Sequence, residues 1–107
     1  YNQHLISSVT TPYCHEQGRM VYNQYTIRVS QRDLFQQYLN EHTIGNAIYY
    51  PIPLHLQACF ASLGYVTGDC PQAEKAAMSV ISIPIYAELT DTQRDYVVSV
   101  INQFHAN

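Results

Sequence analysis

The 107-residue sequence contains no tryptophan, one lysine (Lys75) and few charged side chains of either sign. The net charge is −3 and no run of basic residues is present, so nucleic acid is not an expected partner. The apolar runs are too short to cross a bilayer, and no signal peptide is visible at Tyr1. These absences predict a cytoplasmic protein with neither nucleic-acid nor membrane partners.

Cysteine is also scarce, with thiols only at Cys14, Cys59 and Cys70. An odd number of cysteines without a C-x-x-C pair argues against both a disulfide framework and a zinc site. We therefore expect no metal site and reduced thiols. The sequence has no G-x-S-x-G, no Gly-rich phosphate loop and no H-E-x-x-H. Consequently, no self-contained catalytic centre is predicted.

The hydrophobic content of 47% is sufficient for a globular fold, and the length predicts a single domain over residues 1–107. Three segments have the character of strands. Residues 21–29 alternate between apolar and polar side chains, residues 46–50 read NAIYY, and residues 80–85 are β-branched and apolar. Pro84 should end the pairing of the last strand.

Capping boxes predict the start of two helices. Ser30 with Asp33 precedes a periodic apolar stretch that should end near Thr43, and Thr90 with Gln93 precedes the last helix. The core-facing side of this last helix is expected to comprise Val97, Val100, Ile101 and Phe104.

Two further helices are expected between the second and third strands. Residues 57–65 should form a short helix that Gly64 ends. Residues 71–79 are good helix formers, with Asp69 as the expected N-cap and Pro71 in the first turn. The resulting β-α-β-loop-α-β-α order predicts a small two-layer α/β domain, with about three short strands and three or four helices.

The loop YYPIPLHLQ, residues 49–57, contains Pro51 and Pro53, which exclude a helix and weaken any strand. The prolines make the loop stiff, and His55 lies at its tip. From these residues alone, the favoured interpretation is a buried imidazole bonded to a backbone carbonyl, and a binding residue is the alternative. Solvated or capping side chains are expected for His4, His15, His42 and His105.

Four segments resemble, in order, the C-terminal domain of sugar aminotransferases of the DegT/DnrJ/EryC1/StrS group. They are YNQYTIRVSQRDLFQQYL (22–39), IYYPIPLHLQ (48–57), GDCPQAEKAA (68–77) and SIPIYAELTDTQRDYVV (82–98). The resemblance covers nearly all of the chain from Tyr22 onward. Residues 1–21 match loosely, as the end of an interdomain helix and a connector.

The resemblance implies the small C-terminal domain of a fold-type I enzyme that uses pyridoxal phosphate (PLP), with mainly antiparallel strands. It also implies that the loop lies at the edge of the active-site cleft, where Tyr50 and His55 would face a nucleotide-sugar substrate. A sugar binds both hydrogen-bonding groups and flat apolar surface, which tyrosine supplies together. Tyr49, on the other face of the expected strand, is predicted to lie in the core.

The Schiff-base lysine of this family belongs to the large N-terminal domain, and Lys75 is expected to be a solvated residue. No catalytic residue is therefore assigned to this chain, which should neither bind PLP covalently nor transaminate alone. Its expected partners are the missing N-terminal PLP-binding domain and, in the parent protein, a second subunit of a homodimer. Exposed apolar surface and self-association are expected for the isolated domain.

Three functions remain open for the parent protein. The first is transfer of an amino group, expected to come from glutamate, to a keto group of a nucleotide-linked sugar. The second is a PLP-dependent keto-deoxysugar dehydratase, and the third is a non-enzymatic regulatory or binding module of the same fold. The family often has Gly where Thr43 stands and Pro where Ala87 stands. Since Thr does not readily adopt a left-handed cap, the first helix is expected to end differently.

Overall fold

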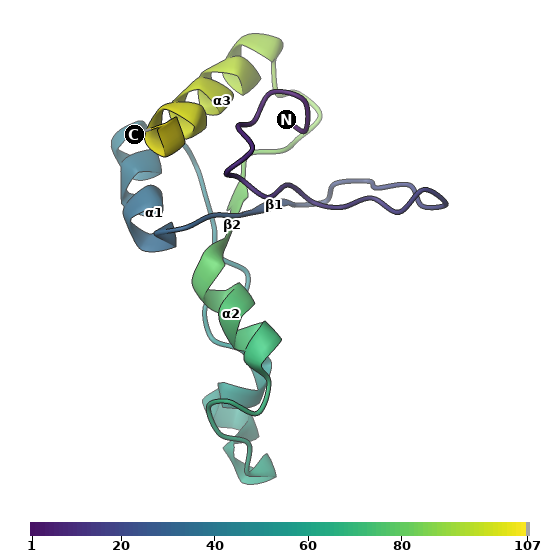
Figure 1. Cartoon of the computed structure of the whole chain (residues 1–107), viewed down its shortest axis with the longest axis vertical. Coiled ribbons are helices and arrows are strands. Elements are labelled where there is room, and N and C mark those ends of the chain that lie inside the picture. The colour runs from purple at the N-terminus through teal and green to yellow at the C-terminus, as the bar shows by residue number, and fades with distance from the viewer. Residues whose placement is uncertain (107) are drawn as a thin grey trace.

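Two short antiparallel strands form the centre of the fold (Figure 1). The computed structural model describes residues 1–106. β1 (Tyr25–Arg28) pairs with β2 (Val80–Ile83), with Thr26 opposite Ser82. The helical elements are α1 (Arg32–Glu41), α2 (Pro71–Ser79), α3 (Asp91–Ala106) and the 3-10 turns η1 (Leu54–Leu56) and η2 (Ala58–Leu63). The small α/β fold with antiparallel pairing is confirmed.

The expected strand at residues 46–50 is reduced to a single antiparallel bridge between Ala47 and Ser82. The Ala47 N–H donates to the Ser82 carbonyl at 3.1 Å, and the Ser82 N–H donates to the Ala47 carbonyl at 2.7 Å. Beyond this bridge the chain leaves the sheet towards Pro51 and Pro53, neither of which can donate a backbone hydrogen bond. Thr10 makes a similar bridge to Arg28 at the opposite edge.

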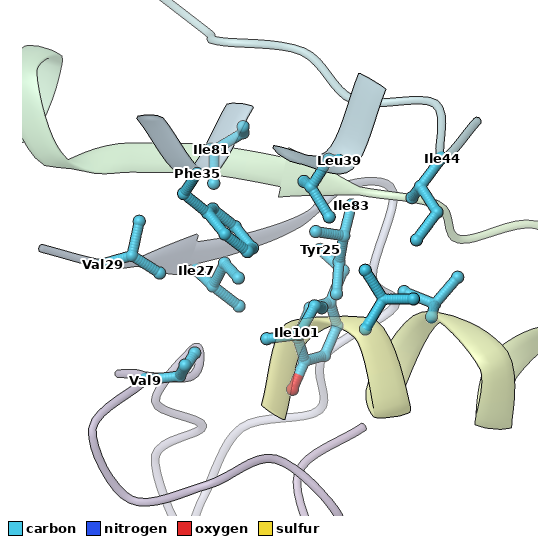
Figure 2. Close-up of a cluster of buried hydrophobic side chains, with 12 residues drawn as sticks. Val9, Tyr25, Ile27, Val29, Phe35, Leu39, Ile44, Ile81, Ile83 and Ile101 are labelled. Carbon is cyan, nitrogen blue, oxygen red and sulfur yellow. The ribbon is translucent and has the colours of Figure 1, made fainter. Parts of the chain in front are cut away.

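The core lies between the strands, α1 and α3 (Figure 2). Its largest fully buried side chains come from all four elements: Ile27, Phe35, Leu39, Ile81 and Ile101. On α3 the predicted core-facing residues Val97, Val100 and Ile101 are buried, and Phe104 packs against the same cluster. This cluster is the main source of hydrophobic stabilisation in so small a sheet, because two strands alone bury little surface.

The N-terminal turn is held against α3 by Asn102. The Ile6 N–H donates to Asn102 Oδ1 at 2.9 Å, and Asn102 Nδ2 donates to the His4 carbonyl at 2.8 Å. The Tyr1 carbonyl accepts hydrogen bonds from the N–H groups of His4 and Leu5, which makes a single helical turn. Its assignment to an interdomain helix stays a prediction.

Two of the predicted helix caps are wrong. Ser30 does not cap α1, because Gln31 precedes the helix in a left-handed conformation (φ 51°) and no side chain makes a capping bond. Asp69 does not cap α2 either, because Cys70 is the N-cap residue. The Asp69 carboxylate instead accepts a hydrogen bond from the Val66 N–H at 2.9 Å, which closes the turn ahead of the helix.

Other predicted boundaries are confirmed. Gln93 N–H donates to Thr90 Oγ1 at 3.2 Å and Thr90 N–H donates to Gln93 Oε1 at 3.0 Å, which completes the reciprocal capping box of α3. Pro71 occupies the first turn of α2, and Gly64, with φ 78°, ends η2. The short helix expected at 57–65 is therefore present, as a 3-10 helix.

α2 continues into β2 without a loop, and Arg32 fastens this junction to α1. The Arg32 side chain is only 10% exposed. Its Nη1 donates to the carbonyl of Ala77 at 2.9 Å and to the carbonyl of Val80 at 3.2 Å. In Figure 1, α2 extends away from the sheet and carries η1 and η2 at its far end. The segment 49–70 therefore projects from the core and is anchored through α2.

α1 ends in a Schellman motif with Thr43 at the left-handed position. Thr43 has φ 57°, its N–H donates to the Asn40 carbonyl at 3.0 Å, and the Ile44 N–H donates to the Leu39 carbonyl at 2.9 Å. Leu39 and Ile44 are both buried. The expectation that the helix would end differently is therefore wrong: the hydrophobic contact and the two hydrogen bonds hold a β-branched residue in a strained conformation.

Replacing Thr43 with Gly should stabilise the chain by about 0.5–1 kcal/mol. Relief of left-handed strain is worth about 1–2 kcal/mol, and the greater freedom of glycine in the unfolded chain offsets about half of this gain. Urea denaturation of the 107-residue chain measures the difference. The reciprocal control is Gly64→Thr, which should destabilise the chain because Gly64 is also left-handed. A lower unfolding midpoint for Thr43→Gly would contradict the assignment of strain.

His105 lies in the last turn of α3 and is half-buried rather than solvated. Its ring centroid is 5.0 Å from those of both Phe35 and Phe104. Within residues 1–106, no hydrogen-bond partner is present for the buried Nε2 atom. Burial lowers the pKa of His105 below its ordinary value of 6.5.

This lowered pKa predicts that the stability of the chain depends on His105 at mildly acidic pH. Below about pH 6.5 the unfolded chain takes up a proton at His105 while the folded chain resists it, so the free energy of unfolding falls as pH falls. His105→Leu should remove this contribution. In thermal melts from pH 8 to pH 5, the melting temperature of the variant should rise relative to that of the wild type as pH decreases. Melting temperatures that fall in parallel for the two proteins would refute the prediction.

Candidate functional site

The proline loop at residues 49–57 leaves the sheet at Ala47 and becomes part of the projecting segment. Tyr50 is 72% exposed, so it is accessible to a ligand. Tyr49 is 49% exposed, so its predicted place in the core is wrong. Strand alternation does not extend to Tyr49 because the pairing stops two residues before it.

His55 lies in η1 with its side chain only 8% exposed. Its Nε2 is 3.0 Å from an oxygen of the Glu74 carboxylate on α2, and that carboxylate is itself only 16% exposed. The imidazole is thus buried, as the residues alone favoured, but its partner is a carboxylate rather than a backbone carbonyl. Among residues 1–106, no hydrogen bond or ring contact joins Tyr50 to His55.

The Glu74 carboxylate oxygen that faces His55 also accepts a hydrogen bond from the Gly68 N–H at 2.8 Å. This backbone bond is the largest cause that holds the pKa of Glu74 below its usual range, and the hydrogen bond with His55 is the next. Glu74 is therefore ionised at neutral pH and joins three segments, η1, the turn at Gly68 and α2. Sequence analysis did not identify Glu74 as part of the site.

His55 borders an apolar pocket of about 370 Å³. The edge of the Tyr65 ring faces the imidazole, with 6.3 Å between the ring centroids and 89° between the planes. Leu54, Phe60, Leu63 and Cys70 provide most of the remaining walls. Such a pocket can hold a flat or apolar group beside a single polar ring edge, which is typical of ligand sites.

Lys75 is exposed on α2 and is the sole lysine of the sequence. No group of three or more His, Cys, Asp or Glu side chains within residues 1–106 is arranged to hold a metal ion. None of the helices within the described residues is long and apolar enough to span a membrane. The arrangement around His55 can therefore bind and orient a ligand.

Comparison with known proteins identifies relatives over nearly the whole chain. Residues 1–102 match the model of the DegT/DnrJ/EryC1/StrS aminotransferase family. A pleiotropic regulatory protein of Geobacillus stearothermophilus is 51% identical over 85 residues, which are 79% of this chain and 23% of that protein. The UDP-N-acetyl-3-dehydro-alpha-D-glucosamine 3-aminotransferase of Acidithiobacillus ferrooxidans is 35% identical over 104 residues, 96% of this chain and 28% of that protein.

The fold is similar to that of a solved DegT/DnrJ/EryC1/StrS aminotransferase from Brucella abortus, with a TM-score of 0.90 and 29% identity. The match covers 99% of this chain and 28% of that chain. The chain thus spans about a quarter of the length of these relatives. Since the family match extends over almost all of its residues, the chain belongs to the DegT/DnrJ/EryC1/StrS aminotransferase family.

Proposed function

We propose that this chain is the C-terminal small domain of a longer PLP-dependent enzyme that aminates a keto group on a nucleotide-linked sugar. The observation that carries the proposal is the family match over residues 1–102. A relative named as an aminotransferase of a UDP-linked keto sugar supports the substrate class. The amino group would come from glutamate, which leaves as 2-oxoglutarate, and would replace the keto oxygen of the sugar.

In this proposal the chain contributes substrate-binding groups and the N-terminal domain contributes the cofactor site. Tyr50 offers a hydroxyl and a ring face to the sugar, at low entropic cost because its side chain has few rotatable bonds. His55 lines the neighbouring pocket with an imidazole of fixed orientation. Pro51 and Pro53 restrict the loop that carries both residues, which reduces the ordering needed on binding.

The remainder of the parent protein would cover apolar side chains that this chain leaves exposed. Ile52, Leu54 and Leu63 on the projecting segment are exposed large hydrophobic residues. Their exposure confirms the predicted apolar surface and supports a partner at this end of the chain. Within the same proposal, the parent protein is cytoplasmic and forms a homodimer.

A second candidate function is regulatory. It is favoured by one observation, the 51% identity to a protein named as a pleiotropic regulator. A regulator that has kept the fold would need neither the cofactor nor an aminated product, so cofactor binding separates the two candidates.

The full-length gene product purified with PLP should be yellow, and borohydride should fix the pyridoxyl group to a lysine that precedes Tyr1 in the protein. Peptide mapping identifies the lysine, and amination of a nucleotide-linked keto sugar with glutamate is then assayed. Bound PLP that borohydride does not attach to lysine would instead indicate the dehydratase. A full-length product that binds no PLP would overturn the enzyme proposal in favour of the regulatory one.

Tyr50→Phe in the full-length protein should raise the KM for the nucleotide sugar several-fold, because it removes one hydrogen bond worth about 1 kcal/mol. The KM for glutamate should change little. Tyr13→Phe is the matched control, since Tyr13 is also an exposed tyrosine but lies in the loop before β1. Equal KM values for the nucleotide sugar in the Tyr50→Phe variant and the wild type would show that the Tyr50 hydroxyl does not bind the sugar.

A further inference from the structure

The Glu74 carboxylate connects parts of the chain that are far apart in sequence. His55 is 19 residues before it and Gly68 is 6 residues before it, yet both lie within 3.0 Å of the same carboxylate oxygen. The oxygen is thus shared between an imidazole and a backbone N–H. Both side chains of the pair are largely buried, which strengthens the interaction relative to a surface ion pair.

The chemistry of the pair fixes the orientation of the imidazole. An ionised carboxylate can only accept hydrogen bonds, so the Nε2 atom of His55 must carry the hydrogen. In neutral His55 the Nδ1 atom is then a hydrogen-bond acceptor, with a direction set by the Nε2 bond. Among residues 1–106, Nε2 is the only ring nitrogen of His55 for which a hydrogen bond is present.

Glu74 is itself attached to the sheet at the centre of the fold. It lies on α2, which continues directly into the buried strand β2. Arg32 holds the junction of these elements through the carbonyls of Ala77 and Val80. The loop that carries His55, in contrast, has no strand pairing after Ala47. The hydrogen bond from His55 to the Glu74 carboxylate therefore links the loop to a helix that the sheet and Arg32 hold in place.

We propose that Glu74 is a positioning residue that acts through His55, and that it holds the 49–57 segment and Tyr50 in the geometry needed to bind the sugar. This inference rests on the proposed function, since it names a determinant of the same substrate site. Glutamate, the amino donor, has no nucleotide or sugar group for the 49–57 segment to bind. Its binding should therefore not depend on the contact between Glu74 and His55. Loss of Glu74 should therefore affect one substrate more than the other.

The test compares five variants of the full-length protein with the wild type. Glu74→Ala removes both hydrogen bonds, and Glu74→Gln keeps a carbonyl oxygen that can accept from His55 or Gly68. Lys75→Ala is the matched control, because Lys75 is exposed on the same helix. His55→Ala alone and the double variant Glu74→Ala with His55→Ala complete the set, and together they test whether the two residues act as one unit.

The first readout is backbone hydrogen exchange and does not require activity. In Glu74→Ala, exchange across residues 54–57 should accelerate about tenfold, the factor that corresponds to losing one hydrogen bond to a charged group. Exchange in α3 should be unchanged, and Lys75→Ala should match the wild type throughout. Unchanged exchange at 54–57 in Glu74→Ala would overturn the proposal.

The second readout is the split between the two substrates. Glu74→Ala should raise the KM for the nucleotide sugar about tenfold while the KM for glutamate stays within about twofold, since only one substrate uses the loop. Glu74→Gln should restore most of the sugar affinity. In the His55→Ala background, Glu74→Ala should add no further effect. Equal losses for both substrates, or additive effects of the two variants, would show a merely structural role and overturn the proposal.

The outcomes distinguish this inference from the proposed function. If the wild type is active and Glu74→Ala changes neither hydrogen exchange nor the KM for the nucleotide sugar, the role of Glu74 is disproved. The aminotransferase proposal is unaffected by that outcome. A wild type that binds no PLP and aminates no sugar removes the proposed function and, with it, the role of Glu74 in sugar binding. In that case, the exchange comparison still decides whether Glu74 fixes the His55 segment.

Discussion

The antiparallel pairing of β2 is the constraint on which the rest of the structure depends. β2 pairs with β1 along one edge, and Ser82 makes a two-bond bridge to Ala47 at the other. Since β2 follows α2 without a loop, its direction also fixes the direction of α2. Arg32 reinforces this junction by donating to two backbone carbonyls from a largely buried position. The place of Glu74, and through it of His55, therefore follows from the sheet.

This arrangement separates the stability of the domain from its binding surface. The fully buried side chains belong to the strands, α1 and α3, whereas residues 49–66 contribute none to the core (Figure 2). Most of that segment is exposed, and it is ordered by prolines, 3-10 turns and the Glu74 carboxylate rather than by hydrophobic burial. Substitutions of binding residues on such a segment should leave the packing of the core unchanged, because their side chains are not part of the core.

Sequence reasoning succeeded for two local features, failed for two helix caps that other local conformations displaced, and failed where the chain makes a distant contact. The capping box at Thr90 and the turn at Gly64 are local, and both were predicted correctly. Ser30 and Asp69 were assigned as caps from equally good local patterns, but a left-handed residue and a turn hydrogen bond replaced them. Glu74 was overlooked because a glutamate beside a lysine on a polar helix is typical of solvated surface. Its partner His55 is distant in sequence, so no periodicity indicates the pair.

Glu74 and Lys75 illustrate why position on a helix decides the role of a charged residue. The two are adjacent on α2, yet one side chain faces η1 and the other faces solvent. A helix rotates about 100° per residue, so neighbouring side chains point in different directions. A one-residue shift of α2 would bury the lysine against His55 and expose the glutamate. The loop-free junction with β2 prevents this shift, because moving α2 would also invert the faces of the strand. The sheet register therefore determines which charge reaches the loop, and a carboxylate in that place can orient an imidazole where an ammonium group would repel its protonated form.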